Sequence, residues 1–297
     1  MKYLAIDIGG TFIKYALMDQ NTNILERGSV KTPYEGIEAL IEAIGYLYDK
    51  YEQQIVGMPI SMPGIIDSKN GIALTGGALT YISNLNIKEL LHKRCPTNIS
   101  IENDGKCAAL AETWKGSLKD CDDGIVIVLG TGIGGGIIKD RKVHKGKNFF
   151  AGEFSFIGTN IDAFFDSKYR WALQNGASTL NKEVAQAKNM DVNELDGVKI
   201  FEMANNGDGE VLEVLNRFTQ RIATQIYNLQ CIYDPEKIAI GGGISAQDLL
   251  IDLIKKNLNK IYVHFNEDIP RAEVVRCEFL NDSNLIGATY NLITSEK

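Results

Sequence analysis

The sequence has few of the residues that bind metal ions when they lie close together in a chain. Its 297 residues include five cysteines and three histidines, and no two cysteines have the spacing C-x-x-C. Zinc sites are commonly built from cysteine and histidine at short spacings, so we expect no zinc site made of neighbouring residues. The scattered cysteines also predict reduced thiols, as in a cytoplasmic protein.

Long apolar runs and an excess of positive charge are also missing. The longest uncharged apolar run, Ile125–Ile138, contains five glycines and is shorter than a membrane span. The first carboxylate, Asp7, comes too early for the apolar region of a signal peptide. The net charge of −7 argues against nucleic acid or an anionic membrane as a partner. We therefore expect a cytoplasmic protein that binds small molecules.

Two stretches of the chain, Leu4–Asp19 and Ile125–Asp140, share one pattern. Each consists of an apolar β-rich run, a turn of glycine and threonine, a second run and a closing aspartate. The pattern predicts a β-hairpin whose turn offers backbone N–H groups to an anion, because glycine has no side chain to block the approach. One such hairpin in each half of the chain predicts two lobes that bind one polyphosphate between them.

The first turn, Asp7-Ile8-Gly9-Gly10-Thr11, follows an apolar strand that ends in a carboxylate. An unpaired carboxylate at such a place is costly, which favours a functional role over an ordinary hairpin turn. We expect Asp7 to hold Mg²⁺ through water, since this ion prefers carboxylates and keeps several waters. We expect the glycines and the threonine to contact phosphate.

Two further glycine clusters lie in the second half of the chain. The turn Gly130–Gly136 has spacing similar to G-x-G-x-x-G, but a strand follows it instead of a helix, which disfavours a Rossmann motif. The cluster Gly241–Gly243 lies between a strand and a helix. It could contact a phosphate or a flat ring, or it could be a tight connection, and the sequence leaves both open.

Glu102-Asn103-Asp104 stands where a short strand, Asn98–Glu102, meets a helix, Asp104–Trp114. A carboxylate at this junction could accept a proton from an attacking hydroxyl, or it could simply cap the helix. With a helix over residues 37–51 and a strand near 55–60, the first half has the order β-β-α-β-α, which predicts an α/β fold.

Domain boundaries follow from the polar stretch Lys115–Asp123, which suits a hinge. We predict a small N-terminal lobe over residues 1–115 and a large C-terminal lobe over residues 116–283. A last helix, over about residues 284–297, is expected to pack back on the small lobe.

Taken together and in this order, the motifs resemble the ROK family of sugar kinases and repressors. The resemblance covers nearly the whole chain and implies a two-lobed, actin-like ATPase fold of the hexokinase type, with duplicated hairpin and helix lobes. The segments that carry it are Asp7–Thr11, Ser61–Gly64 with Asp67, Asn84-Leu85, Glu102–Asp104, Leu129–Gly136, Gly152-Glu153, Asp234–Glu236 and Gly241–Gly243.

The resemblance implies ATP-dependent phosphorylation of a hexose hydroxyl, usually O6, with Mg²⁺ as cofactor. It implies Asp104 as the general base and, with Asn84, Asn103 and Glu153, as a ligand of the sugar. It also favours a homodimer. The residues that it implies as contacts of ATP are Asp7, Gly9, Gly10, Thr11, Lys14, Gly130, Thr131, Gly132, Gly242 and Gly243.

The chain departs from the family pattern in three places. Phe156 stands where a histidine that binds sugar and zinc is common, and the segment Gly158–Phe165 has no cysteine where the family's zinc motif would follow. Zinc is therefore not implied. The first strand begins at Tyr3, which leaves no place before it for a DNA-binding helix-turn-helix.

The missing histidine and nearby aromatic residues suggest an open, apolar end of the sugar site, which would accept a β-glucoside such as cellobiose. The residues could equally be core; they are Phe149, Phe150, Phe154, Phe156, Phe164 and Phe165. Glucose and another hexose such as N-acetylmannosamine stay open as substrates. A sugar-sensing regulator without kinase activity and an actin-like assembly ATPase are the alternatives from other classes.

Overall fold

The computed structural model describes residues 1–163, 165–265 and 268–295, and its elements are mixed α and β. The chain forms two compact units. Unit 1 contains Met1–Lys115, Lys142–Ala151 and the C-terminal segment from Asp282 onward. Unit 2 contains Gly116–Arg141 and Gly152–Asn281.

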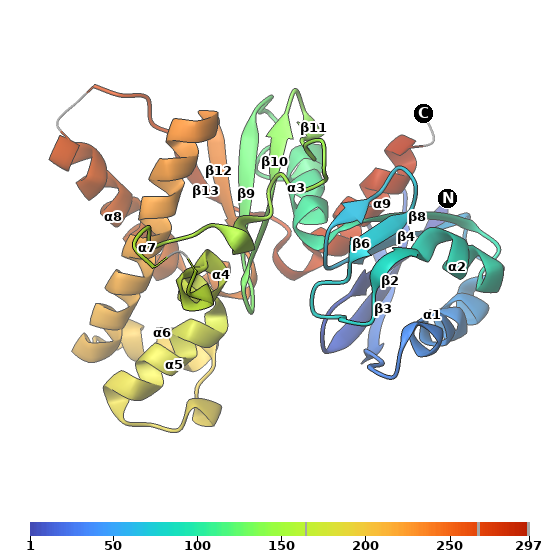
Figure 1. Cartoon of the computed structure of the whole chain (residues 1–297), viewed down its shortest axis with the longest axis horizontal. Helices are drawn as coiled ribbons and strands as arrows, with labels where there is room; N and C mark the ends of the chain where they lie inside the picture. The colour runs from blue at the N-terminus through green and yellow to red at the C-terminus, as the bar shows by residue number, and fades with distance from the viewer. Residues whose placement is uncertain (164, 266–267, 296–297) are drawn as a thin grey trace. The chain divides into compact units, whose positions relative to one another are not determined.

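A five-stranded sheet forms the centre of unit 1, in the order β3-β2-β1-β4-β8 (Figure 1). β2 runs antiparallel to both β1 and β3, whereas β4 is parallel to β1 and β8 is parallel to β4. The side chains of β1 are buried from Tyr3 to its end, as expected of a central strand covered on both faces. The strands are β1 (Lys2–Ile8), β2 (Phe12–Asp19), β3 (Ile24–Lys31), β4 (Gly57–Met62) and β8 (Asn98–Asn103).

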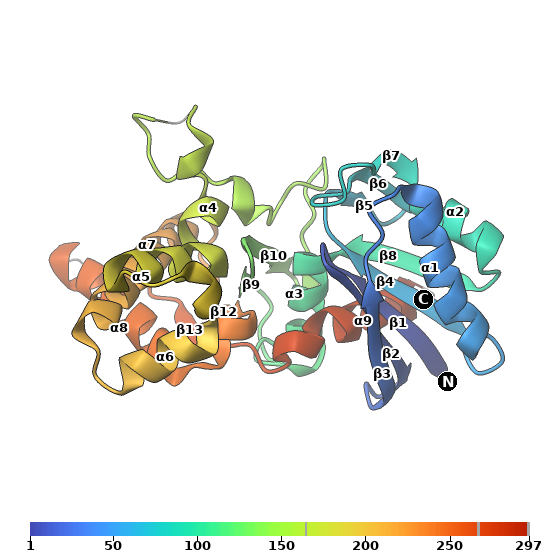
Figure 2. The same ribbon diagram turned by 90° about the horizontal axis from the view of Figure 1, so that it is seen from below.

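Helices cover this sheet on its two faces (Figure 2). On one face α1 (Ile37–Tyr51) buries an apolar stripe that includes Leu40 and Ile44, and α2 (Ile87–Arg94) lies beside it. On the other face α9 (Ser283–Ser295) packs on α3 (Asp104–Lys115) and contacts β1 and β4. The ends of β1, β4 and β8 are thereby held in a rigid frame.

A small antiparallel sheet of three strands follows β4 in the chain. It consists of β5 (Ile66–Asp67), β6 (Ile72–Thr75) and β7 (Ser83–Asn86). The connection from β4 turns at Gly64, where φ is +105° and an added Cβ would lie 2.0 Å from the carbonyl oxygen of Thr75. Only glycine fits such a place without moving the backbone.

Unit 2 is built around four strands of a second five-stranded sheet, whose order is β11-β10-β9-β12-β13; its edge strand β11 belongs to the segment Lys142–Ala151 of unit 1. β10 is antiparallel to β9, and β12 is parallel to both β9 and β13. The strands are β9 (Gly124–Leu129), β10 (Ile133–Lys139), β11 (Lys142–Val143), β12 (Lys237–Gly241) and β13 (Glu273–Arg276). The helices of unit 2 are α4 (Trp171–Asn175), α5 (Ala177–Lys188), α6 (Gly197–Asn205), α7 (Gly209–Tyr233) and α8 (Asp248–Phe265).

The largest apolar cluster of unit 2 joins β9 and β12 to the helices α5, α7 and α8. α7 packs along α8 and α5, and its buried side includes Phe218 and Ile222. Short 3₁₀ turns complete the fold at Phe154–Phe156, Ser167–Tyr169, Val192–Glu194, Gly243–Ala246 and Leu280–Asp282, the last at the boundary between the two units.

The structure differs from the sequence-based boundaries in one internal segment and by two residues near the C-terminus, since Asp282 and Ser283 belong to unit 1. Lys142–Ala151 belongs to unit 1, although the sequence placed it in the large lobe over residues 116–283. The reason is a set of contacts with unit 1 that includes the ion pair of Lys145 with Glu102. The sequence also missed β3, α2 and the small sheet. Of the expected last helix, residues 296 and 297 lie outside the described part of the chain.

None of the helices in the described part of the chain combines the length and the apolar character that are needed to cross a bilayer.

Candidate functional site

Asp7 lies near the end of β1 in unit 1, and the neighbouring parallel strand places Ser61 directly beside it. The Asp7 Oδ1 atom accepts hydrogen bonds from Ser61 Oγ at 2.8 Å and from Asn284 Nδ2 of α9 at 3.1 Å. Burial raises the pKa of this carboxyl, while the two hydrogen bonds and the charge of Lys14 act to lower it. Asp7 is therefore a carboxylate kept in a costly place by dedicated donors.

The turn after β1 offers backbone donors, but fewer than the sequence suggested. The N–H of Gly9 donates to the carbonyl oxygen of Phe12 at 3.0 Å and closes the turn, so it is not available to a phosphate. Within the described residues, the N–H groups of Gly10 and Thr11 have no backbone acceptor. Thr32, the residue after β3, holds this turn in place, because its Oγ1 donates to the Gly9 carbonyl oxygen at 2.7 Å. Two N–H groups of this turn thus remain for an anion.

Asp104 stands at the junction of β8 and α3, where the sequence predicted it. Its Oδ1 atom accepts hydrogen bonds from the backbone N–H of Gly105 at 2.8 Å and from Asn103 Nδ2 at 3.0 Å. Asn103 also donates to the Gly64 carbonyl oxygen at 2.9 Å and accepts from the N–H of Lys106 at 3.0 Å. The orientation of the Asp104 carboxylate is therefore fixed by its neighbours.

Asn103 and Asn84, the other expected sugar ligands in unit 1, differ in exposure. Asn103 is buried, and both hydrogens of its amide are engaged by the Gly64 carbonyl and by Asp104. The position of Asn103 supports a role in orienting Asp104 as well as the predicted one in sugar binding. Asn84, on β7, is exposed and has φ of +51°, a conformation that asparagine tolerates better than most residues.

The donors around Asp7 fit a magnesium ion better than a metal held by protein ligands alone. Mg²⁺ is typically bound through one or two carboxylates together with phosphate oxygens and water. Asp7 supplies one such carboxylate beside a turn with two N–H groups for phosphate. In the described part of the chain, no group of three or more His, Cys, Asp or Glu side chains could hold a metal ion.

In unit 2, the turn Gly130-Thr131-Gly132 joins β9 to β10. It is one residue tighter than the first turn, since Leu129 pairs with Ile133 whereas Ile8 pairs with Ile13. The N–H of Gly130 donates to the Gly132 carbonyl oxygen at 3.0 Å and closes it. Val128 stands in the place that Asp7 has in the first hairpin, so this turn carries no acid. Its possible contacts with a phosphate come from backbone N–H groups and the threonine hydroxyl.

Sequence reasoning missed Gly176, which supports this second turn from outside the hairpin. An added Cβ at Gly176 would lie 2.1 Å from the Thr131 carbonyl oxygen, so only glycine allows the approach. The next residue, Ala177, begins α5 and donates its N–H to the Gly130 carbonyl oxygen at 2.8 Å. The second turn therefore lies at the N-terminus of α5, the end of a helix that favours anions.

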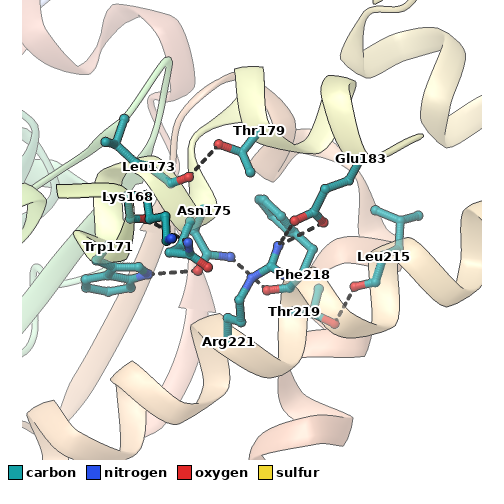
Figure 3. A network of polar contacts seen from close by, with 11 residues as sticks. Lys168, Trp171, Leu173, Asn175, Thr179, Glu183, Leu215, Phe218, Thr219 and Arg221 are labelled. Carbon is teal, nitrogen blue, oxygen red and sulfur yellow. Dashed lines mark hydrogen bonds and ion pairs between the residues drawn. The ribbon is translucent and has the colours of Figure 1, made fainter. Parts of the chain in front are cut away.

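A network of polar contacts, part of it buried, holds the N-terminus of α5 in place (Figure 3). Asn175 is fully buried, accepts from Trp171 Nε1 at 3.2 Å and donates to the Phe218 carbonyl oxygen of α7 at 2.8 Å. Arg221 of α7 pairs with Glu183 of α5 at 2.8 Å. Nothing near Trp171 in the sequence indicated such a role, because the contacts of Asn175 with Phe218 and of Glu183 with Arg221 join residues more than 35 positions apart.

The third glycine cluster touches the same strand end. Gly242 has φ of +92°, and an added Cβ would lie 2.2 Å from the Leu129 carbonyl oxygen at the end of β9. Gly243 faces open space, with no atom within 4 Å of an added Cβ. The sequence left a tight connection and an exposed backbone as alternatives for this cluster. Gly242 makes the tight connection, and Gly243 exposes its backbone.

The aromatic residues near Glu153 do not form one group. Phe154 is core: it packs on Gly135 and on Trp171, with its ring centroid 6.1 Å from that of Trp171. Phe156 is 48% exposed, and the guanidinium of Arg170 lies 5.5 Å from its ring centroid. The proposed aromatic end of the sugar site must therefore omit Phe154, whereas Phe164 lies outside the described residues. Glu153 is half-buried beside Gly152, whose φ is +83°.

Comparisons with known proteins agree with this picture. The ROK family model matches residues 3–294 of the chain. A beta-glucoside kinase from Listeria innocua serovar 6a is 31% identical over 298 residues, which cover 100% of this chain and 99% of that protein.

Two solved structures are similar over nearly the whole length of both chains. The structure of a ROK family protein from Streptococcus pneumoniae TIGR4 in complex with sucrose has a TM-score of 0.88 at 28% identity, covering 100% of this chain and 99% of that one. The structure of a ROK family glucokinase from Streptomyces griseus in complex with glucose and AMPPNP has a TM-score of 0.86 at 25% identity, covering 97% and 98%.

Proposed function

The chain belongs to the ROK family and is an ATP-dependent sugar kinase, and from this premise we propose that it phosphorylates O6 of glucose or of a β-glucoside such as cellobiose, with Asp104 as the general base. The observation that carries the proposal is the fixed Asp104 carboxylate at the end of β8. A carboxylate held in this way can accept the proton of a hydroxyl without a loss of orientation.

The transfer proposed for this site is a simple displacement. The sugar hydroxyl gives its proton to Asp104 while its oxygen forms a bond to the γ-phosphorus, and the bond to the bridging oxygen breaks to release ADP. We propose that Asn84, Asn103 and Glu153 bind the sugar. The ATP contacts we propose are Asp7, Gly10, Thr11, Lys14, Thr131, Gly132, Gly242 and Gly243. Mg²⁺, when held by Asp7, would neutralise charge on the phosphate oxygens.

Replacing Asp104 by asparagine tests the proposed base. The asparagine side chain keeps the shape and one accepting oxygen but cannot take up the proton, so kcat should fall about 10²–10⁴-fold. Sugar binding, measured by calorimetry, should be largely kept because the amide can still form hydrogen bonds with the sugar. A variant that turns over ATP as fast as the wild type in the presence of sugar would exclude Asp104 as the base.

The β-glucoside is favoured by the exposure of Phe156, which leaves an apolar ring next to the proposed sugar ligand Glu153 in the sequence. The relative from Listeria innocua is a beta-glucoside kinase, which supports the same choice. The kinetic constants for glucose and cellobiose, measured by coupled ADP release, test it. An enzyme that turns over glucose but gives no detectable product with cellobiose is a glucokinase, and one active only on another hexose, such as N-acetylmannosamine, contradicts both substrates.

The alternative from another class is a sugar-sensing protein that binds sugar without phosphorylating it. The fixed Asp104 and the two turns with available N–H groups favour the kinase. We also propose that the protein is cytoplasmic and that it forms a homodimer. Light scattering on the purified protein would test the homodimer.

A further inference from the structure

Glu102, which directly precedes the Asn103-Asp104 pair, is a fully buried carboxylate. Its Oε1 atom accepts a hydrogen bond from the backbone N–H of Asn103 at 2.8 Å. Its Oε2 atom accepts no hydrogen bond of normal geometry from the residues that the structure describes. The Lys145 ammonium, however, lies 2.5 Å from Oε2. Glu102 and Lys145 therefore form an ion pair, and the buried carboxylate of Glu102 depends on the Lys145 ammonium to balance its charge.

Lys145 reaches Glu102 from the segment Lys142–Ala151, which interrupts unit 2 in sequence but belongs to unit 1. Its ammonium also donates to Ser68 Oγ, and its carbonyl oxygen accepts from the N–H of Ala151 at 3.2 Å. The side chain is 27% exposed, so most of it is enclosed. One lysine thus fastens the segment to the end of β8.

Negative charge is concentrated around this strand end. Cys107, fully buried on α3, has a pKa well above the usual range, first because of burial and then because of the carboxylates of Glu102, Asp7 and Asp104. Carboxylates that share a site disfavour each other's ionised forms. The cations on the elements around them are Lys14 on β2, Lys106 on α3 and Lys145, and Asp67 on β5 adds a further acid.

A continuous path of contacts leads from Lys145 to the proposed base. Lys145 holds the Glu102 carboxylate, which binds the Asn103 backbone, and the Asn103 side chain holds the Asp104 carboxylate. We propose that Lys145 is a positioning residue of the phosphoryl-transfer site, which neutralises Glu102 and so keeps the end of β8 in the conformation that presents Asp104. The inference rests on the proposed function, in which Asp104 is the base.

The first test replaces the cation alone. In Lys145→Met, a negative charge stays buried without its partner, and the strand end should shift to relieve it. We expect kcat per folded molecule to fall about 10- to 100-fold, the size typical of a small displacement of a catalytic group, with the KM for ATP little changed. Lys147→Met is the matched control, since Lys147 lies in the same segment and is exposed, and it should behave as the wild type.

The second test restores charge balance. Lys145→Met combined with Glu102→Gln removes both charges of this pair and so leaves neither without its partner, and the glutamine oxygen can still accept from the Asn103 N–H. We expect this double variant to recover kcat to within about threefold of the wild type, and Lys145→Arg to keep most of the activity because it keeps the cation. If Lys145→Met does not fold, the double variant still decides: folded and active supports the proposal, folded and inactive overturns it.

Two results would overturn the role of Lys145 without touching the proposed base. One is a Lys145→Met enzyme with the kcat of the wild type per folded molecule. The other is a double variant no more active than Lys145→Met. In both cases Asp104→Asn, assayed in parallel, would still be inactive; if Asp104→Asn is active instead, the proposed function itself fails.

Discussion

The β1–β2 hairpin of unit 1 and the β9–β10 hairpin of unit 2 share the order strand, glycine turn and strand, but they differ in register by one residue and in charge. In each, the first glycine of the turn donates its N–H across the turn at 3.0 Å, Gly9 to Phe12 and Gly130 to Gly132. The strand before the turn contains Asp7 in the first hairpin and Val128 in the second. Two related hairpins thus carry an acid before the turn in one unit and an apolar residue there in the other.

The groups that hold the two hairpins in place also differ: side chains act on the first, and backbone acts on the second. Asp7 is held by side-chain donors, Ser61 and Asn284, which act on its charge. The Gly130–Gly132 turn is held by backbone, through Ala177 and the close approach of Gly176 to the Thr131 carbonyl oxygen. The comparison favours the proposals that Asp7 of unit 1 holds Mg²⁺ and that the turn of unit 2 offers backbone groups to phosphate oxygens.

Among the variants that test this comparison, Asp7→Asn should have the largest effect on kcat, because it makes the first hairpin neutral like the second. We expect kcat to fall about 10²–10³-fold, the order that the loss of one preorganised electrostatic contact costs. The required Mg²⁺ concentration should rise, because the variant lacks the carboxylate that we propose holds the ion. Initial rates at several Mg²⁺ concentrations would measure both effects. Val128→Thr, the matched change in the second hairpin, should leave kcat almost unchanged.

The variant Asp7→Asn should also have a higher free energy of unfolding than the wild type at neutral pH. Burial raises the pKa of Asp7, so ionised Asp7 lowers the free energy of unfolding, and this cost is present above the folded-state pKa. Asparagine carries no such cost. The gain should vanish as the pH falls below the usual carboxyl value of 3.8, where Asp7 is neutral in both states. Urea unfolding at neutral and acid pH measures it, and equal stabilities at neutral pH would show that Asp7 bears no net cost.

The hairpins were predictable because their information is local. The alternation of apolar strands around a glycine turn predicted both, and the 3.6-residue spacing of apolar residues predicted α1 over Ile37–Tyr51. The junction of β8 and α3 at Asp104 was predictable for the same reason. Together these motifs led to the ROK family and to its actin-like ATPase fold, which the structure and the comparisons confirm.

The supports of the site were not predictable, since each depends on residues distant in sequence. Asn284 lies 277 positions from Asp7, and no local pattern marks it as a donor to that carboxylate. Gly176 lies between two helices as an ordinary break, and only the approach to Thr131 shows why it is glycine. The return of Lys142–Ala151 to unit 1 likewise depends on tertiary contacts such as Lys145 with Glu102.

A smaller effect is expected from Gly176→Ala, which disturbs the second hairpin through its support. Gly176 has φ of −68°, so alanine causes no backbone strain there, and its effect comes from the clash of the added Cβ with the carbonyl oxygens of Thr131 at 2.1 Å and Ala172 at 2.9 Å. We expect a loss of about 1–3 kcal/mol in the free energy of unfolding, as for overpacking elsewhere. The KM for ATP should rise about tenfold while the affinity for sugar is kept, because a displaced turn loses part of its phosphate contacts.

Gly209→Ala is the matched control for this change. Gly209 begins α7, and no atom lies within 4 Å of an added Cβ. Alanine there should be neutral or stabilising by about 0.5–1 kcal/mol, with the KM for ATP of the wild type. If Gly176→Ala were destabilised but kept the wild-type KM for ATP, the approach of Gly176 would serve stability alone, and the second hairpin would have no supported phosphate site.

The smallest effect should come from Ser61→Ala, which leaves the charge of the first hairpin in place and removes one of its donors. The Ser61 hydroxyl lowers the pKa of Asp7, so its loss raises that pKa further, while the burial of Asp7 is unchanged. Since Asp7 must be ionised to hold Mg²⁺, the acid limb of kcat/KM should move to higher pH. The activity relative to the wild type should be nearly normal at alkaline pH and should fall as the pH is lowered. Ser100→Ala is the control, because Ser100 is a buried serine on β8 whose hydroxyl has no hydrogen-bond partner among the described residues. An acid limb that moves equally in both variants, or in neither, would mean that ionisation of Asp7 does not limit the reaction, and the charge difference between the two hairpins would then have no part in catalysis.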